Sequence, residues 1–300
     1  MSAAGLWGLL VGDAFGVPYE FHSPSALPER SALAMTPPAG FARAHHGTPP
    51  GTWSDDGAQA LALLASLVAC DGLDPDDLSR RLVAWYRRGD YAVDARVFDV
   101  GIQTRRALSA LEAGVSALKA GPAGEYDNGN GSLMRVLPLA LWHRGDDAAL
   151  VEDAHRQSRV THGHARSQAA CALTCLWARR LVGGADSEAA FADAAAALAA
   201  LYRDRPEFAA ELSTQLVVEG TPGGSGYVVD TVRSARWALR QGSYEAVVRA
   251  AVSLGNDTDT TACVAGGLAA VRDGMGAIPG EWLAALRGQE IVRPLAAALG

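Results

Sequence analysis

The stretch Asn256-Asp257-Thr258-Asp259-Thr260-Thr261 decides how the rest of this 300-residue chain is interpreted. It follows the apolar residues 250–255 and leads into a predicted helix of small residues over 262–271. Carboxylate and hydroxyl oxygens are the ligands that hard divalent cations take. This C-terminal acidic cluster (residues 256–261) therefore predicts a metal site at a helix start.

A second acidic cluster, Ser54-Asp55-Asp56, also precedes a helix pattern, far away in the sequence. Helix capping is the alternative for either cluster alone, because Asp, Ser and Thr are common at helix starts. One cap, however, needs one oxygen, whereas each cluster supplies two carboxylates and at least one hydroxyl. Acids crowded among apolar residues require cations or protons. We therefore expect the two clusters to meet in space and hold metal.

An EF-hand calcium loop can be tested directly from the spacing. With Asp257 at position one, position six is Ala262 where the loop needs Gly, and position twelve is Leu268 where it needs Glu. The calcium-loop interpretation fails.

Composition narrows the classes of protein. The net charge is −7, and Lys119 is the only lysine, so no basic footprint for nucleic acid is expected. No apolar run is long enough to span a bilayer, so no membrane partner is expected. The first basic residue is Arg30, which is inconsistent with the charged start of a secretory signal. We expect a cytoplasmic protein.

Hydrophobic periodicity predicts helices throughout. They are expected over residues 2–14, 57–69, 75–88, 94–112, 146–159, 163–181, 188–200, 227–240, 244–252 and 262–271, with two short ones after Pro279. Residues 22–50, rich in Pro, Gly and Ser, are predicted as a long loop. No convincing alternating strand occurs. The expected fold is all-α, with one compact multi-helix domain spanning residues 1–300.

Other segments offer candidate site residues. Glu20 is the lone acid in apolar residues 17–21; surface exposure is one reading, and a general base or metal-facing carboxylate is the other. The glycine-rich turn 128–132 lacks P-loop features, yet its backbone amides suit phosphate; a plain turn is the alternative. His162 is predicted near a helix cap or a substrate. His45 and His46 are expected to be solvated in the long loop.

Taken together, five short motifs resemble those of the ADP-ribosylglycohydrolase family, which includes the dinitrogenase reductase-activating glycohydrolases. In the family's order along the chain they are Gly12-Asp13-Ala14-Phe15-Gly16 with Glu20, Trp53-Ser54-Asp55-Asp56, Asn128-Gly129-Asn130-Gly131-Ser132-Leu133-Met134-Arg135, Thr161-His162 and Asp257-Thr258-Asp259-Thr260. Ser54 stands where the family usually has Thr, Gly57 where Thr often follows the acids, and Asn256 where Gly is frequent. The metal set is intact, and the substrate is left open.

The resemblance implies an all-α fold with a binuclear metal cleft that holds two divalent cations, Mg²⁺ or Mn²⁺. The implied metal ligands are Ser54, Asp55, Asp56, Asp257, Asp259 and Thr260. The implied catalytic residues are Glu20, Asp55 and Asp56. The implied substrate-binding residues are Gly129, Asn130, Gly131, Ser132, Met134 and His162, with Ser225, Gly226 and Tyr227 on the adenosine side.

The implied activity is metal-dependent hydrolysis of an N- or O-glycosidic bond at the anomeric carbon of ADP-ribose, which reverses mono-ADP-ribosylation. The expected partner is an ADP-ribosylated protein or a small ADP-ribose derivative, and nucleic-acid-linked ADP-ribose stays open. Arginine, serine, nucleobase and O-acetyl linkages share the same ADP-ribosyl half. A catalytically silent ADP-ribose-binding regulator, or a metal-dependent hydrolase of another nucleotide derivative, is the alternative.

Overall fold

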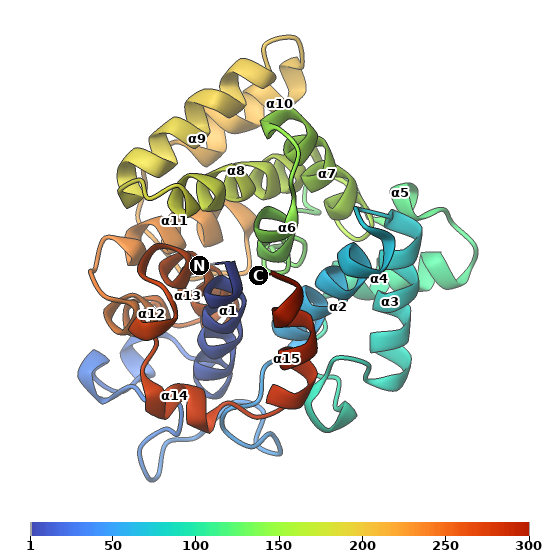
Figure 1. Cartoon of the computed structure of the whole chain (residues 1–300). Coiled ribbons are helices and arrows are strands. Elements are labelled where there is room, and N and C mark those ends of the chain that lie inside the picture. Colours follow the sequence, from blue (N-terminus) through green and yellow to red (C-terminus); the bar gives the residue numbers. More distant parts are fainter. Residues whose placement is uncertain (1, 300) are drawn as a thin grey trace.

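The computed structural model describes residues 2–299, and its main secondary-structure elements are α-helices (Figure 1). In chain order they are α1 (Ser2–Gly16), α2 (Asp55–Cys70), α3 (Pro75–Arg88), α4 (Ile102–Glu112), α5 (Ala117–Ala120), α6 (Leu137–Trp142), α7 (Asp147–Arg159), α8 (Ala165–Val182), α9 (Ser187–Leu201), α10 (Pro206–Glu211), α11 (Val228–Leu239), α12 (Tyr244–Ser253), α13 (Thr258–Asp273), α14 (Gly280–Ala285) and α15 (Gln289–Ala296). Within these residues there is no β-strand, only an isolated bridge between Gly129 and Tyr227. The all-α prediction is confirmed.

Local sequence signals set most of the helix boundaries. In α3, the Asp74 side chain accepts hydrogen bonds from the amides of Asp76 and Asp77, and Pro75 occupies the first turn. The helix ends at Gly89, whose φ of 74° lies in the left-handed region that glycine tolerates. Residues 75–88 therefore form the helix that the sequence predicts.

The predicted helix over residues 94–112 is wrong in its first half. The α-helix begins only at Ile102, because Asp94, Ala95 and Asp99 have φ values of 54°, 53° and 55°. A left-handed φ interrupts a right-handed helix wherever it occurs. A short 3₁₀ turn, Val93–Ala95, is followed by an irregular segment over 96–101, which carries Asp99 into the pocket described below.

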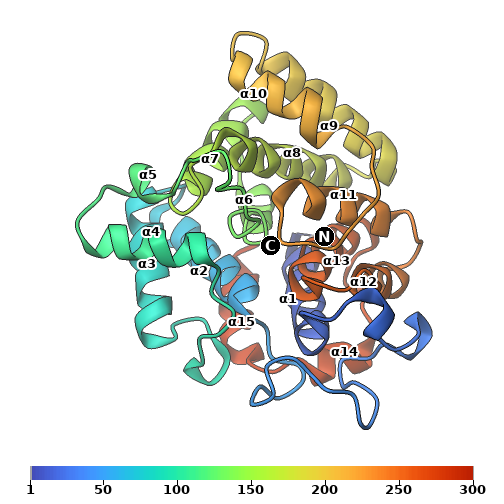
Figure 2. The same ribbon diagram turned by 180° about the vertical axis from the view of Figure 1, so that it is seen from behind.

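The helices α1 and α13 pack against each other along their length at the centre of the fold (Figures 1 and 2). Glycines on α1 allow this contact. A Cβ atom at Gly12 would lie 2.1 Å from the carbonyl oxygen of Ala262, and one at Gly16 would lie 2.4 Å from the Cα of Asp259. Because real Cβ atoms cannot approach so closely, the two backbones meet only where side chains are missing. This packing holds the end of α1 against the C-terminal acidic cluster.

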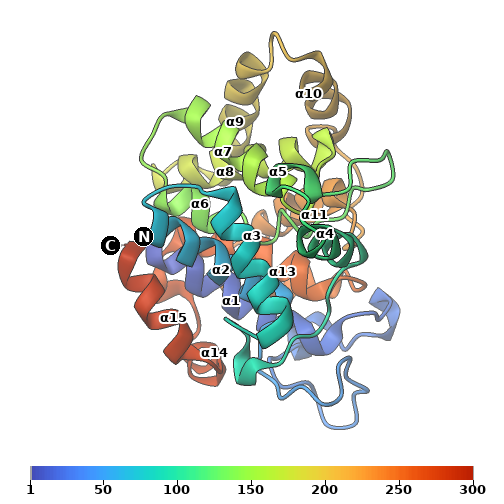
Figure 3. The same ribbon diagram turned by 90° about the vertical axis from the view of Figure 1, so that its right-hand side faces the viewer.

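Two details of this pair differ from the sequence prediction. Helix α1 continues to Gly16 and is followed by a 3₁₀ turn, Val17–Tyr19, which leads directly to Glu20. Helix α13 begins at Thr258 and not at residue 262, so most of the acidic cluster lies in its first turn. The remaining helices surround the pair, with α9 and α10 at one end and α14 and α15 at the other (Figure 3). Among residues 2–299, no helix has the length and hydropathy needed to cross a membrane.

Candidate functional site

A pocket of about 640 Å³ collects most of the candidate residues from distant parts of the chain. Five carboxyl side chains line it, together with glycines, amides and a few apolar groups. The lining residues are Glu20, Phe21, Asp55, Asp56, Asp99, Gly101, Ile102, Gln103, Thr104, Gly129, Asn130, Gly131, Met134, His162, Ser225, Gly226, Asn256, Asp257 and Thr260. No Lys or Arg is among these lining residues.

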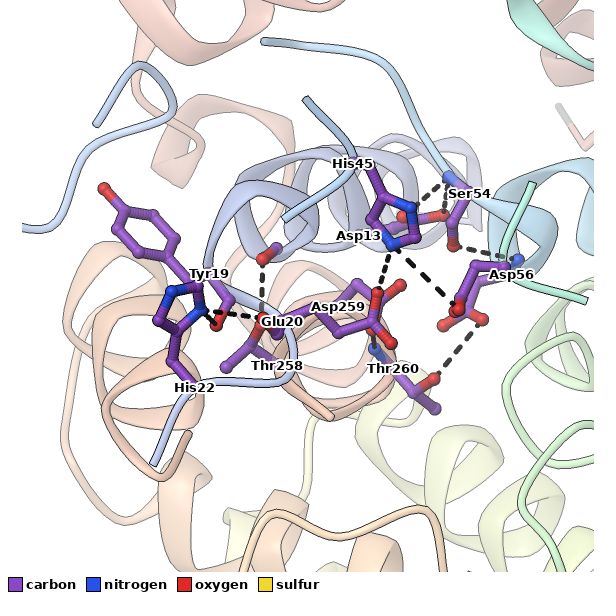
Figure 4. A network of polar contacts seen from close by, with 12 residues as sticks. Asp13, Tyr19, Glu20, His22, His45, Ser54, Asp56, Thr258, Asp259 and Thr260 are labelled. Atoms are coloured by element: carbon purple, nitrogen blue, oxygen red, sulfur yellow. Dashed lines mark hydrogen bonds and ion pairs between the residues drawn. The ribbon is translucent and has the colours of Figure 1, made fainter. Parts of the chain in front are cut away.

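The two acidic clusters meet at the start of α2 and α13. The Thr260 hydroxyl donates a hydrogen bond of 3.3 Å to Oδ1 of Asp56 (Figure 4). Asn130 Nδ2 donates one of 2.7 Å to Oδ2 of Asp257. Carboxylate oxygens of Glu20, Asp257 and Asp259 lie within 4.8 Å of one another. The expected meeting of the clusters is therefore present.

A buried aspartate fixes the first cluster. Both oxygens of Asp13, on α1, accept from the amide of Ser54 at 2.9 and 3.1 Å, and Oδ2 also accepts from the amide of Gly57 at 2.8 Å. Ser54 in turn caps α2, because its hydroxyl accepts from the amide of Asp56 (Figure 4). Helix α1 thus positions both clusters, through Asp13 on one side and Gly16 on the other.

The pocket suits a cation. The side-chain atoms Oδ2 of Asp56 and Oδ2 of Asp259 are buried and have no hydrogen-bond partner among the described residues. Burial raises the pKa of Asp55, Asp56 and Asp259 well above the usual range, and neighbouring carboxylates raise it further. Unpartnered acceptors in an environment that penalises negative charge are what a bound cation would satisfy.

Glu20 forms a second group with residues that the sequence did not single out. It is only 3% exposed, so the surface reading of Glu20 is wrong. Its Oε2 lies 2.6 Å from Nε2 of His45 (Figure 4). The same Nε2 is 4.0 Å from Oδ1 of Asp99. Burial, together with Asp99 and Asp257, raises the pKa of Glu20 to about 12, and burial raises the pKa of Asp99 to about 7.

His45 is therefore not simply solvated, as its loop position suggested. Its ring packs between Phe21 and Phe98, with centroid distances of 5.6 and 4.9 Å, and burial lowers its pKa. The neighbouring His46 is exposed, as expected. The long loop thus places one histidine against the pocket residue Glu20 and leaves the other in solvent.

The glycine-rich turn forms another wall. The Gly129 amide donates to Oε1 of Gln103, and the Asn130 amide donates to the Gly226 carbonyl, whereas the amides of Gly131 and Ser132 donate to no described residue. A Cβ atom at Gly131 would lie 2.8 Å from Cε1 of His162, so glycine is required there. Free amides in a concave turn are suited to an anion.

His162 is buried behind this turn. Its Nδ1 lies 2.9 Å from the Thr161 hydroxyl. Burial, with a smaller effect of Arg135, lowers the pKa of His162 to about 3, so the imidazole is neutral near pH 7. It contributes shape and hydrogen bonding to the pocket, and no charge.

The structure separates the predicted site residues into two groups by position. Those that line the pocket are Glu20, Asp55, Asp56, Asp257, Thr260, Gly129, Asn130, Gly131, Met134, His162, Ser225 and Gly226. Ser54, Asp259, Ser132 and Tyr227 do not line it. Ser54 and Asp259 are buried beside the clusters, the Ser132 hydroxyl lies 2.9 Å from that of Ser158, and the Tyr227 hydroxyl accepts from Arg166.

Asp99, Gln103 and Thr104 are polar pocket residues that the sequence analysis does not identify as site residues. All three lie within residues 94–112, where the spacing of apolar residues predicts a helix. A lone acid in the apolar run 97–100 is the same signal that drew attention to Glu20, and it could have identified Asp99.

Comparison with known proteins agrees with this geometry. The model of the ADP-ribosylglycohydrolase family matches residues 2–300. The ADP-ribosylarginine hydrolase Tri1 of Pseudomonas putida (strain GB-1) is 31% identical over 296 residues, which cover 97% of this chain and 75% of that protein. The ADP-ribosyl-dinitrogen reductase glycohydrolase of Rhodospirillum rubrum is 31% identical over 284 residues, covering 93% and 87%.

A solved structure supports the same assignment. The protein described as an ADP-ribosylglycohydrolase-related protein complex is 34% identical, has a TM-score of 0.77, and is matched over 99% of this chain and 96% of its own. The chain therefore belongs to the ADP-ribosylglycohydrolase family of glycosidic-bond hydrolases.

Proposed function

We propose that this protein hydrolyses the bond between ADP-ribose and an arginine side chain of a modified protein, with two divalent cations, Mg²⁺ or Mn²⁺, as cofactors. One observation carries the proposal: two acidic clusters 204 residues apart and a glycine-rich turn line one pocket. The names of the two enzymes that resemble this chain, an ADP-ribosylarginine hydrolase and a dinitrogen reductase glycohydrolase, favour a protein substrate.

The ADP-ribose would lie across the pocket from the turn to the acidic clusters. Its diphosphate would accept a hydrogen bond from the amide of Gly131, since the pocket lining offers no Lys or Arg. The adenosine would lie along Ser225 and Gly226, with Tyr227 next to them. The distal ribose would then reach the carboxylates.

The residues that would hold the cations are Asp55, Asp56, Asp257, Asp259 and Thr260, with Ser54 at the edge of the set. Their oxygens match the preference of Mg²⁺ and Mn²⁺ for carboxylate and hydroxyl ligands. When bound, the cations would keep the carboxylates ionised and orient the ribose hydroxyls as a template.

The chain's own groups account for the rest of the reaction. Glycosidic bonds break through an oxocarbenium-like state, so the carboxylates around the ribose would stabilise its positive charge. Glu20, held by His45, is placed to take the proton of the attacking water once it is ionised. Asp99, beside Glu20 and His45, is free to contact the leaving group.

The arginine linkage is supported by the charge of this side of the pocket. A guanidinium pairs with carboxylates through two parallel hydrogen bonds. Glu20 and Asp99 both line the pocket, and no cationic lining residue competes with an incoming guanidinium. A serine-linked or O-acetyl substrate would bring no positive charge to pair with Asp99.

A hydrolysis panel tests the proposal. Arginine-, serine-, nucleobase- and O-acetyl-linked ADP-ribose would be incubated with the protein, with and without Mg²⁺ or Mn²⁺, and released ADP-ribose measured. We expect cation-dependent release that is fastest from the arginine linkage. Release that persists undiminished after chelation, or that favours another linkage, would contradict it, and equal product release by wild type and Glu20→Ala would instead indicate a binding protein.

A further inference from the structure

Arg135 is a fully buried cation that contacts no carboxylate of residues 2–299. It is 0% exposed, and it follows the glycine-rich turn. Its Nε donates to Oε1 of Gln157 at 3.1 Å, and its Nη2 donates to the Gln157 carbonyl at 2.9 Å. Burial lowers the pKa of Arg135 to about 10, so the guanidinium is still charged at neutral pH. A buried charge held only by neutral acceptors is costly and calls for an explanation.

One nitrogen of Arg135 faces both halves of the site. Nη1 donates to Oε1 of Gln59 at 2.9 Å and to the Gly131 carbonyl at 3.3 Å. Gln59 lies on α2, the helix that begins with the first acidic cluster, and Gly131 lies in the glycine-rich turn. The same guanidinium therefore links the proposed cation side to the proposed diphosphate side.

Gln59 extends this hydrogen-bond network to Asp55. Its Nε2 donates a hydrogen bond of 2.9 Å to Oδ2 of Asp55. Because a guanidinium can only donate, the oxygen of the Gln59 amide must face Arg135, and its Nε2 therefore faces Asp55. Oδ1 of Asp55 accepts from no described residue and is left for a ligand in the pocket.

We propose that Arg135 and Gln59 couple the two halves of the site, so that a divalent cation at Asp55 and ADP-ribose at the glycine-rich turn strengthen each other's binding. A ligand that restricts the motion of Asp55 also restricts Gln59 and the Arg135 guanidinium. The entropy cost of fixing Gly131 is then smaller when the second ligand binds. The effect must be reciprocal, because coupling between two binding equilibria is symmetric. Both are positioning residues, and the inference rests on the proposed function.

Binding measurements, with no turnover, test the coupling. ADP-ribose affinity would be measured by calorimetry with and without Mn²⁺, and Mn²⁺ affinity with and without ADP-ribose, in wild type and Gln59→Met. Direct contacts between cation and ribose, and chelation in solution, are common to both proteins and cancel in the comparison. We expect the ratio of affinities to fall by about fivefold or more in Gln59→Met, near the lower end of typical coupling factors.

Further variants separate this role from general support of the fold. Gln59→Glu keeps an acceptor for Arg135 but removes the donor to Asp55, so we expect it to lose coupling as well. Gln289→Met, which removes another helical glutamine that donates to backbone carbonyls outside the pocket, should keep the full ratio. If Gln59→Met does not fold by circular dichroism, Gln59→Glu and Arg135→Lys give the same comparison.

The outcomes are distinct. Wild type that binds neither ligand would overturn the proposed function itself. Wild type that binds both, with the same affinity ratio in the Gln59 variants to within about twofold, would overturn only the coupling.

Discussion

The hydroxyl of Thr260, in the first turn of α13, donates a hydrogen bond of 3.3 Å to Oδ1 of Asp56, in the first turn of α2. This contact brings together two helix starts, each of which carries two aspartates. The other oxygen of Asp56 is buried and has no hydrogen-bond partner among the described residues. The contact that joins the clusters therefore leaves a buried acceptor oxygen of Asp56 without a partner, and a bound cation would satisfy it.

Replacing Asp56 with Asn should change stability in opposite directions with and without cation. Without cation, Asp56→Asn removes one buried carboxyl and its repulsion with neighbouring acids, so its Tm should equal or exceed that of wild type. Saturating Mn²⁺ should raise the wild-type Tm, since a ligand at 100 times its Kd adds about 2.7 kcal/mol. The variant should gain little. Thermal unfolding with chelator and with Mn²⁺ measures both effects.

Asp193→Asn is the matched control. Asp193 is a surface carboxylate, with a side chain 65% exposed and paired with Arg180. Its variant should show the full increase in Tm on addition of Mn²⁺. An equal increase for Asp56→Asn would contradict a cation site at this cluster.

The adjacent histidines 45 and 46 offer a second comparison. His45 holds the Glu20 carboxyl through a contact of 2.6 Å, whereas His46 is exposed. A hydrogen bond to a charged group contributes about 1.5–3 kcal/mol. His45→Ala should therefore lower kcat by about tenfold or more, with a smaller change in KM, and His46→Ala should leave both unchanged. Steady-state kinetics measures both constants. Equal kcat and KM values for the two variants would exclude a role for His45.

The sequence predicts correctly those elements whose boundaries are set by residues close by in the chain. Helix α3 has its cap, its first-turn proline and its terminal glycine within the same 16-residue stretch, and its boundaries were predicted correctly. The two acidic clusters were recognised because each is dense in its own sequence. Their meeting was inferred from the cost of leaving such charge unpaired, and the contact between Thr260 and Asp56 agrees with that inference.

Residues whose position depends on distant contacts or an unusual backbone were missed. Asp99 has a φ of 55° inside a segment with helical spacing of apolar residues, so the pattern indicated a helix that does not form. His45 also has a positive φ, of 50°, and its partner Glu20 is 25 residues away. Neither periodicity nor composition contains information about such conformations.

The contribution of His155 to the free energy of unfolding should decrease as the pH is lowered, because the imidazole must then take up a proton. His155 is buried beneath Phe208, with Nε2 2.6 Å from the Tyr202 hydroxyl, and burial lowers its pKa from 6.5 to about 3. The unfolded chain binds this proton near pH 6.5 and the folded chain does not, so the contribution is complete above pH 6.5. It should be lost by up to about 1.4 kcal/mol per pH unit between pH 6.5 and about 3.

Urea unfolding of wild type and His155→Phe, at intervals between pH 7.5 and 4.5, measures this contribution. The variant loses the Tyr202 partner and should be less stable at pH 7.5. Its deficit should shrink or reverse as the pH falls, because it has no imidazole to protonate. A deficit that stays constant over this range would show that His155 titrates normally in the folded protein.

Asp99 should matter most for a leaving group that carries positive charge. It lines the pocket and lies 4.0 Å from His45, and in the proposed function it would pair with a guanidinium. Asp99→Asn keeps the shape and one oxygen but removes the charge. It should lower kcat/KM for arginine-linked ADP-ribose by roughly ten- to a hundredfold, the size of a lost charged hydrogen bond, and affect an O-acetyl linkage much less. Parallel assays on the two substrates measure the ratio. Asp127→Asn, which alters a partly buried carboxylate paired with Arg106 outside the pocket lining, should leave the ratio unchanged. An equal loss on both linkages would assign Asp99 to a step common to all substrates, and would remove the structural argument for arginine.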